Sequence, residues 1–217
     1  MALGKKDIAG LRQEYKLGQL DEGELLADPL EQFRRWFNDA LDCGVMEPNA
    51  MVLATASADG QPASRVVLLK DIDPYGLCFY TNYESRKGLE LLHNPCAALL
   101  FFWPELQRQV RVEGIAERLP EEAADAYFQS RPKGSRLGAL ASHQSREIAC
   151  RNVLDDQLAK LEEAYAGTED VPRPAYWGGY RVRPQRFEFW QGRSNRLHDR
   201  LVYKKEESTW KVIRLAP

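Results

Sequence analysis

Three short stretches of the chain combine residues that could bind anions or move protons. In the first, SRKGLELL, Ser85 suits a helix N-cap and predicts a short helix that ends near Asn94 and Pro95. Arg86 and Lys87 then lie in the first turn, where the helix dipole disfavours cations. Free backbone N–H groups, a serine hydroxyl and two cations suit a phosphate, so this turn is a candidate phosphate site. The alternative is that both side chains are simply solvated.

The second stretch, YFQSRPKGSRLGAL, places Arg131, Lys133, Ser135 and Arg136 around a predicted break after a helix. Guanidinium groups and a serine hydroxyl also suit a phosphate, although charges in such a loop are often only solvated. Two such clusters in a chain of net charge −2 indicate two phosphorylated small molecules or one dinucleotide. The sequence lacks the motifs G-x-G-x-x-G, G-x-x-x-x-G-K-[ST] and G-x-S-x-G. We therefore expect the chemistry to depend on a bound cofactor.

The third stretch is QGRSNRLHDRLVY, between two apolar segments near the C-terminus. From Arg193 to Arg200 it contains three arginines, a histidine and an aspartate. Histidine titrates closest to neutral pH, so His198 is a candidate for proton transfer, although surrounding arginines would depress its basicity. The alternative is a histidine held in a turn by Asp199.

The composition sets the class of protein. The 217 residues are 44% hydrophobic and 29% charged, which is typical of a globular chain with a sizeable core. The near-zero net charge argues against a bulk polyanion such as duplex DNA. The four cysteines form no C-x-x-C pair, and the three histidines are too scattered to indicate a metal site. The start of the chain lacks the apolar core of a signal peptide, and the longest apolar run, CAALLFFW, is too short to span a bilayer. We expect a cytoplasmic protein that binds neither nucleic acid nor membranes.

The hydrophobic pattern predicts one α+β domain over residues 28–217, after a mobile N-terminal arm at residues 1–27. A capped helix is predicted over 28–41, with Leu30, Phe33, Phe37 and Leu41 as its buried stripe. Two further helices are predicted over 120–129 and 146–165. Strands are predicted over 51–57, 64–70, 77–82, 97–103, 108–119, 180–184, 186–190, 200–205 and 210–215. Closely spaced strands of this kind are typical of an antiparallel barrel or a strongly curled sheet.

Seven blocks in order resemble the pyridoxamine/pyridoxine 5′-phosphate oxidase family. They are SRVVLLK, FYTNYESRKG, RQVRVEG, YFQSRPKGSRLGA, HQSREI, WGGYRV and FEFWQG…NRLHDR, and they are followed by the terminal RLAP. The resemblance runs from about Leu11 to Pro217. It implies an FMN-binding split β-barrel, mostly antiparallel with peripheral helices, that forms a homodimer with FMN at the subunit interface. It also implies a reaction: pyridoxine 5′-phosphate or pyridoxamine 5′-phosphate gives a hydride from C4′ to the flavin and becomes pyridoxal 5′-phosphate, and O2 takes the electrons to form H2O2.

The resemblance also assigns roles to residues. FMN would be bound by Arg65, Val66, Val67, Leu68, Leu69, Lys70, Tyr80, Thr81, Arg86, Lys87, Gln109, Gln144, Ser145, Trp190 and Arg200, some of them from the partner subunit. The substrate would be bound by Arg12, Tyr15, Lys70, Tyr127, Arg131, Ser135, Arg196 and His198. Arg196 and His198 would be catalytic, projecting from the same side of an extended segment because side chains alternate there.

Several points stay open at the level of sequence. Both His198 and the acidic Glu47 are candidates for the proton acceptor, and Ser145 also suits the N-cap of the helix predicted after it. Two other functions are compatible with the fold: a split-barrel flavin reductase acting on another substrate, and a non-catalytic carrier of pyridoxal 5′-phosphate. The substrate-side blocks YFQSRP…S and RLHDR argue against the reductase, because flavin binding alone would not require both.

Overall fold

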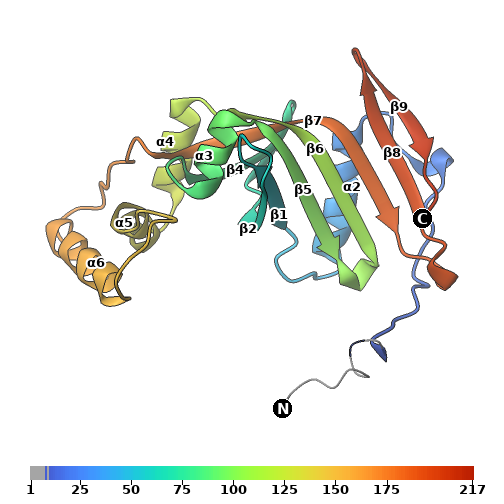
Figure 1. The fold of residues 1–217 in the computed structure, drawn as a ribbon. Helices are drawn as coiled ribbons and strands as arrows, with labels where there is room; N and C mark the ends of the chain where they lie inside the picture. Colours follow the sequence, from blue (N-terminus) through green and yellow to red (C-terminus); the bar gives the residue numbers. More distant parts are fainter. Residues whose placement is uncertain (1–7, 9) are drawn as a thin grey trace. The chain divides into compact units, whose positions relative to one another are not determined.

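The computed structural model describes residue 8 and residues 10–217, so residues 1–7 and 9 of the predicted arm lie outside the described residues. The chain forms two compact units (Figure 1). Of the described residues, unit 1 comprises 8, 10–48, 100–112 and 186–217, and unit 2 comprises 49–99 and 113–185. The long strands β5 (Cys96–Trp103), β6 (Arg108–Arg118) and β7 (Trp177–Gln191) each contribute residues to both units.

Unit 1 is built on helix α2 (Pro29–Asp42). Asp28 caps the helix as predicted, since its carboxylate accepts a hydrogen bond of 2.8 Å from the backbone N–H of Leu30. The predicted buried stripe is only partly right: Phe33 is buried, but Leu41 is exposed, and Trp36 is buried although it was not predicted. Trp36 packs edge-on against Phe189 with ring centroids 5.1 Å apart, which turns that side of the helix toward the core.

The rest of unit 1 is a strand layer with an aromatic core. Strand β8 (Asp199–Glu206) pairs antiparallel with β7 from Gln191↔Asp199 to Arg186↔Lys204, and β9 (Thr209–Arg214) pairs antiparallel with β8. The fully buried aromatic side chains of this unit are Phe33, Phe101, Trp103, Phe187, Phe189 and Tyr203. Because aromatic rings remove a large apolar area from water, this cluster is the main source of stability in unit 1.

Unit 2 contains the predicted N-terminal strands. Strands β1 (Ala50–Ala56) and β2 (Pro62–Leu68) form an antiparallel hairpin, and Gly60 in its turn has φ +87°, a left-handed conformation that glycine adopts at little cost. Strand β4 (Gly76–Asn82) pairs with β7 and with the short β3 (Asp71–Asp73), which was not predicted. The hydrogen-bonded strand order is β2-β1-β5-β6-β7-β4-β3, with β8 beside β7 and β9 beside β8.

The helices of unit 2 include two departures from prediction. Helix α3 (Arg86–His93) and helix α4 (Glu121–Ser130) form where expected. A helix α5 (Lys133–Ala141) follows Pro132 directly, where a loop was predicted. Helix α6 covers Asn152–Ala164 and begins six residues later than predicted. Ser145 is therefore not its N-cap, and the φ of +73° at that residue is incompatible with a helix through it.

The observed architecture confirms the predicted α+β class, and every pairing whose register is known is antiparallel. Short 3₁₀ turns occur at Glu22–Glu24, Pro104–Leu106 and Ser194–Arg196. Among the described residues, no helix has the length and apolarity needed to cross a membrane.

Gly88 gives a test of how tightly α3 is packed. A Cβ at this position would lie 2.2 Å from the backbone oxygen of Tyr83, whereas a Cβ at Gly134 in α5 would meet no atom within 4 Å. We expect Gly88→Ala to destabilise the fold by about 1–3 kcal/mol through overpacking. The control Gly134→Ala should change stability by less than about 1 kcal/mol. Thermal unfolding at one fixed protein concentration checks this, and equal midpoints for the two variants would contradict it.

Candidate functional site

A cavity of about 680 Å³ in unit 2 collects twelve of the predicted FMN- and substrate-binding residues. It is lined by residues from β2, β4, α3, α4, α5 and β7 and from the loops between them. The predicted residues that line it are Arg65, Val66, Val67, Leu68, Lys70, Tyr80, Thr81, Lys87, Tyr127, Arg131, Ser135 and Gln144. The two phosphate-binding stretches of the sequence therefore meet in one cavity.

Lys87 is a buried cation in this cavity. Its ammonium group donates hydrogen bonds to Thr81 Oγ1 at 3.2 Å, Ser85 Oγ at 3.3 Å and Gln144 Oε1 at 2.7 Å. All three acceptors are neutral oxygens. Burial, reinforced by the nearby positive charge of Arg65, lowers the pKa of Lys87 to about 8. A buried ammonium group with neutral partners would be stabilised by an anion placed in the cavity.

Glu90 supplies the negative charge beside this lysine. Its buried carboxylate pairs with Arg65 at 3.2 Å and with Arg86 at 2.8 Å, and it accepts a short hydrogen bond from Thr55. Burial opposes ionisation, but the hydrogen bonds from Thr55 and Arg86 outweigh it and lower the pKa of Glu90. Three cations and one carboxylate leave two positive charges uncompensated in this cluster, which matches the charge of a phosphate monoester dianion.

Ser85 explains why Lys87 lies where it does. Its hydroxyl accepts a hydrogen bond of 3.3 Å from the backbone N–H of Gly88, as the sequence predicted for an N-cap, and it also accepts one from Lys87. The cap thus fixes the first turn of α3 and one partner of the lysine together. Glu90 was not predicted as a site residue. Its position four residues after Arg86 in a predicted helix is the signal that could have revealed the pair.

Arg131 forms a second cationic point in the same cavity. Its Nη1 atom is buried and has no hydrogen-bond partner. The guanidinium lies 4.8 Å from the ring centroid of Trp177, a residue that sequence reasoning missed, and burial lowers the pKa of Arg131. Tyr127 stacks on Tyr80 with centroids 4.0 Å apart, so aromatic rings form one wall of the cavity. A buried guanidinium N–H without a partner costs free energy, which an anionic ligand would recover.

Unit 1 contains a separate cavity of about 570 Å³ lined by Arg12, Tyr15, Arg196 and His198, among others. The prediction of an extended segment at Arg196 is wrong, because residues Ser194–Arg196 form a 3₁₀ turn in which Asn195 and Arg196 have φ values of 55° and 61°. Arg196 and His198 nevertheless line the same cavity, since the turn presents both. Leu197 points away and is 69% exposed.

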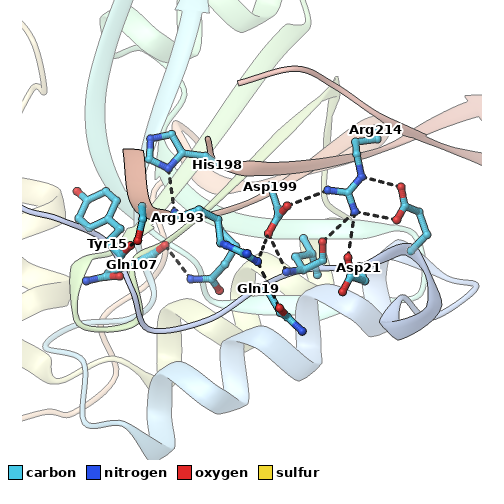
Figure 2. Close-up of polar contacts among 12 residues, drawn as sticks. Tyr15, Gln19, Asp21, Gln107, Arg193, His198, Asp199 and Arg214 are labelled. Carbon is cyan, nitrogen blue, oxygen red and sulfur yellow. Dashed lines mark hydrogen bonds and ion pairs between the residues drawn. The ribbon is translucent and has the colours of Figure 1, made fainter. Parts of the chain in front are cut away.

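His198 is held in one protonation pattern. Its Nδ1 accepts a hydrogen bond of 3.0 Å from the backbone N–H of Arg193, rather than being held by Asp199 (Figure 2). A backbone N–H only donates, so Nδ1 carries no proton and the neutral ring carries its proton on Nε2. Burial, and then the charge of Arg196, lowers the pKa of His198 and favours this neutral form. The ring packs against Trp190 at 4.5 Å between centroids.

Not all predicted site residues share one cavity. Arg86 and Ser145 line a neighbouring cavity of unit 2 that shares Gln144 with the first. Leu69 is buried at 5% exposure, and Gln109 lines neither cavity. Arg200 pairs with the buried Glu188 at 2.8 Å. The predicted substrate-binding set is divided: Lys70, Tyr127, Arg131 and Ser135 belong to unit 2, and Arg12, Tyr15, Arg196 and His198 belong to unit 1. Within the described part of the chain, no group of His, Cys, Asp and Glu could hold a metal ion.

Comparisons with known proteins agree on one family. A family profile described as pyridoxamine 5′-phosphate oxidase matches residues 37–165, and one described as the pyridoxine 5′-phosphate oxidase C-terminal dimerisation region matches residues 177–217. A pyridoxine/pyridoxamine 5′-phosphate oxidase of Rubrobacter xylanophilus is 57% identical over 98% of both chains. A protein of the same name from Cupriavidus pinatubonensis is 54% identical over 97% of this chain and 99% of its own.

Solved structures extend the comparison to the fold. PhzG from Burkholderia lata 383, in complex with tetrahydrophenazine-1-carboxylic acid, is 35% identical with a TM-score of 0.88 and covers 94% of this chain and all of its own. A pyridoxamine 5′-phosphate oxidase-related, FMN binding protein from Nostoc punctiforme is 17% identical with a TM-score of 0.71, over 89% of this chain and all of its own, which shows the fold alone. The predicted split-barrel fold class is confirmed.

The buried lysine predicts a pH dependence of stability in the ligand-free protein. Below about pH 8, Lys87 is protonated in both the folded and the unfolded chain, and burying its charge opposes folding. Between pH 8 and the ordinary lysine pKa, the folded chain releases this proton while the unfolded chain keeps it, so the contribution of Lys87 to stability rises with pH. The stability that Lys87→Met gains relative to wild type should therefore be largest below pH 8.

Urea unfolding at several pH values from 7 to 10 measures this difference. The same series for Lys160→Met, an exposed position on α6, corrects for pH effects shared by the whole fold. A stability difference between wild type and Lys87→Met that stays constant across this range would contradict the assignment.

Proposed function

Because the chain belongs to the pyridoxamine 5′-phosphate oxidase family, we propose that it binds FMN and oxidises pyridoxine 5′-phosphate and pyridoxamine 5′-phosphate to pyridoxal 5′-phosphate. O2 is the electron acceptor and H2O2 the second product. The identity of 57% to a pyridoxine/pyridoxamine 5′-phosphate oxidase over nearly the full length supports this activity over that of the less similar PhzG. The observation that carries the proposal is a single cavity with two separate cationic points, suited to two phosphorylated ligands.

The residues present fit FMN. The ammonium group of Lys87 and the guanidinium of Arg65 leave positive charge at one end of the cavity, where the phosphate of FMN would bind. The exposed side chain of Val66 and the backbone of β2 leave a surface free along the same cavity for a flat ring. When bound, FMN supplies the ring that accepts the hydride from C4′.

The second cationic point fits the substrate phosphate. Arg131 Nη1 is buried without a partner, and Tyr127 and Ser135 add hydroxyl groups to the same cavity. A guanidinium and two hydroxyls can bind a phosphate through charge-assisted hydrogen bonds. The family resemblance assigns Lys70 to both FMN and the substrate. Lys70 lines the same cavity, so it is placed to contact either ligand.

His198 and Arg196 orient the reacting end of the substrate in this proposal. Since His198 carries its proton on Nε2, it donates a hydrogen bond to the oxygen or nitrogen at C4′ rather than accepting its proton. Arg196 lines the same cavity as a permanent cation and helps to align the pyridine ring. Alignment supplies much of the acceleration of a hydride transfer.

We also propose that the protein acts in the cytoplasm as a homodimer, with FMN at the subunit interface and residues from both chains at each site. The match of residues 177–217 to a dimerisation region supports the dimer. That region includes Trp190, Arg196, His198 and Arg200, so residues assigned to the site fall within the segment named for dimerisation.

Oxidation in air tests the proposal. FMN-loaded protein mixed with pyridoxine 5′-phosphate should form H2O2 and pyridoxal 5′-phosphate. Arg131→Gln should raise KM about tenfold to a hundredfold, because it removes a charged hydrogen bond worth about 1.5–3 kcal/mol, and should leave FMN bound. The control Arg151→Gln, on an exposed arginine that pairs with Asp155, should behave as wild type.

Three results would separate the alternatives. Absence of both products would exclude the oxidase. Equal turnover of pyridoxine with and without its phosphate would exclude the Arg131 site and favour another substrate. Tight binding of pyridoxal 5′-phosphate without turnover of either substrate would favour a carrier.

The protonation pattern of His198 gives an independent prediction. A glutamine side chain can place an N–H donor near the position of Nε2, so His198→Gln should keep much more turnover than His198→Ala. If His198 instead accepts the substrate proton, both variants should lose activity equally. Steady-state kinetics of the two variants across pH 6–9 distinguish these roles.

A further inference from the structure

The segment from Tyr15 to Glu22 is hydrogen-bonded to residues on both sides of His198 in unit 1 (Figure 2). Gln107 Oε1 accepts hydrogen bonds from the backbone N–H groups of Lys16 at 2.8 Å and Leu17 at 3.2 Å. Ser194 Oγ donates to the backbone oxygen of Tyr15 at 3.2 Å. We call residues 15–22 the strap and residues 193–198 the turn. The strap therefore contacts the turn through its own backbone.

Asp199 is the acceptor that joins the strap to the turn. Its Oδ2 accepts a hydrogen bond of 3.1 Å from the backbone N–H of Leu20 in the strap, and it pairs at 3.1 Å with the guanidinium of Arg193 in the turn. Its Oδ1 pairs at 2.8 Å with Arg214 of β9. The side chain of Asp199 is only 15% exposed, so these three contacts are shielded from water and are worth more than surface pairs.

Arg214 fastens the strap from its other side. Its Nη2 donates to the backbone oxygen of Leu20 at 3.1 Å, and its guanidinium binds both carboxylate oxygens of Glu22 at 2.7 Å. Bidentate pairing of this kind fixes direction as well as distance. The backbone of Leu20 in the strap is thus held at two points. Its N–H donates to Asp199, and its carbonyl oxygen accepts from Arg214.

The turn needs such support because its backbone is strained. Asn195 and Arg196 are consecutive non-glycine residues with left-handed φ values of 55° and 61°. A conformation of this kind persists only where surrounding contacts determine it. Among the contacts that hold it are the Arg193–Asp199 pair, the Arg193 N–H bond to His198, and the Ser194 bond to the strap. Two of these three depend on Asp199 or on the strap.

We propose that Asp199 is a positioning residue that couples docking of the strap to the shape of the turn, and so places Tyr15, Arg196 and His198 together. Asp199 does not line the cavity that these three residues share, so it acts through Arg193 and Leu20. Tyr15 belongs to this cavity because the docked strap holds its ring centroid 5.9 Å from that of His198 and 5.8 Å from that of Trp190. The consequence for turnover rests on the proposed function, whereas the coupling itself does not.

Hydrogen exchange of the FMN-loaded full chain tests the coupling directly. Asp199→Asn keeps the size of the side chain but removes its charge, and it should increase amide exchange in both the strap and the turn. Arg214→Gln removes contacts to the strap and to Asp199 but touches no residue of the turn, and it should increase exchange in the turn as well. The matched control Lys211→Gln, on the same strand, removes only an exposed contact to Glu206 and should change neither segment.

Kinetics supply a readout that a purely structural role would not move. Asp199→Asn and Arg214→Gln should lower kcat/KM for pyridoxine 5′-phosphate about tenfold, mainly through kcat, which is the effect of losing about 1.4 kcal/mol of alignment in the transition state. The flavin absorbance should be retained. Asp199→Glu, which keeps the charge, should recover part of the loss.

The outcomes are distinguishable. Exchange that rises in the strap alone, or in neither segment, overturns the coupling, as does an unchanged kcat/KM in an active enzyme whose strap has loosened. If the wild-type protein does not turn over the substrate, the proposed function fails, and the exchange data still decide the coupling. If Asp199→Asn does not fold, Arg214→Gln decides it.

Discussion

The candidate site is built around a buried ammonium group whose hydrogen-bond acceptors are all neutral. Lys87 lies in the first turn of α3, against the dipole of its own helix, and its hydrogen bonds go to two hydroxyls and an amide. Such an arrangement opposes folding of the ligand-free chain, as the lowered pKa of the lysine records. A fold keeps an unfavourable charge of this kind where a ligand of opposite charge compensates it. The phosphate of a cofactor is that ligand in the function proposed here.

The other cations in and beside this cavity show how the charge is limited. Arg65 and Arg86 share the buried carboxylate of Glu90, which compensates one charge and fixes the direction of both guanidinium groups. Arg131 has no such carboxylate, and its unsatisfied N–H lies among aromatic rings. Lys87 and Arg131 therefore give the cavity two cationic points, and in the proposed function each would bind one phosphate monoester. A site for a single dinucleotide would not require two such points.

The sequence predicted those features that depend on neighbouring residues in the chain. The Ser85 and Asp28 caps and the strands β1, β2 and β6 follow from local patterns, and the structure has them. Helix α5 was missed because Pro132 was interpreted as a break, although proline also suits the position just before a helix. The turn at Arg196 was missed because left-handed residues other than glycine leave no signal in the sequence. The pairing of Lys87 with Gln144, 57 positions apart, is a property of the tertiary fold.

The strained turn shows why the site residues alone do not define the site. Arg196 and His198 were assigned by resemblance, but their directions are set by residues that touch no ligand in any assignment made from the sequence. The N–H of Arg193 fixes the proton of His198, and the side chain of Arg193 is in turn fixed by Asp199. Asp199 also holds the backbone N–H of Leu20, so a residue 179 positions distant in the chain is joined to the turn that orients His198. Because the strained backbone would relax without these contacts, the placement of Arg196 and His198 and the docking of the strap depend on each other.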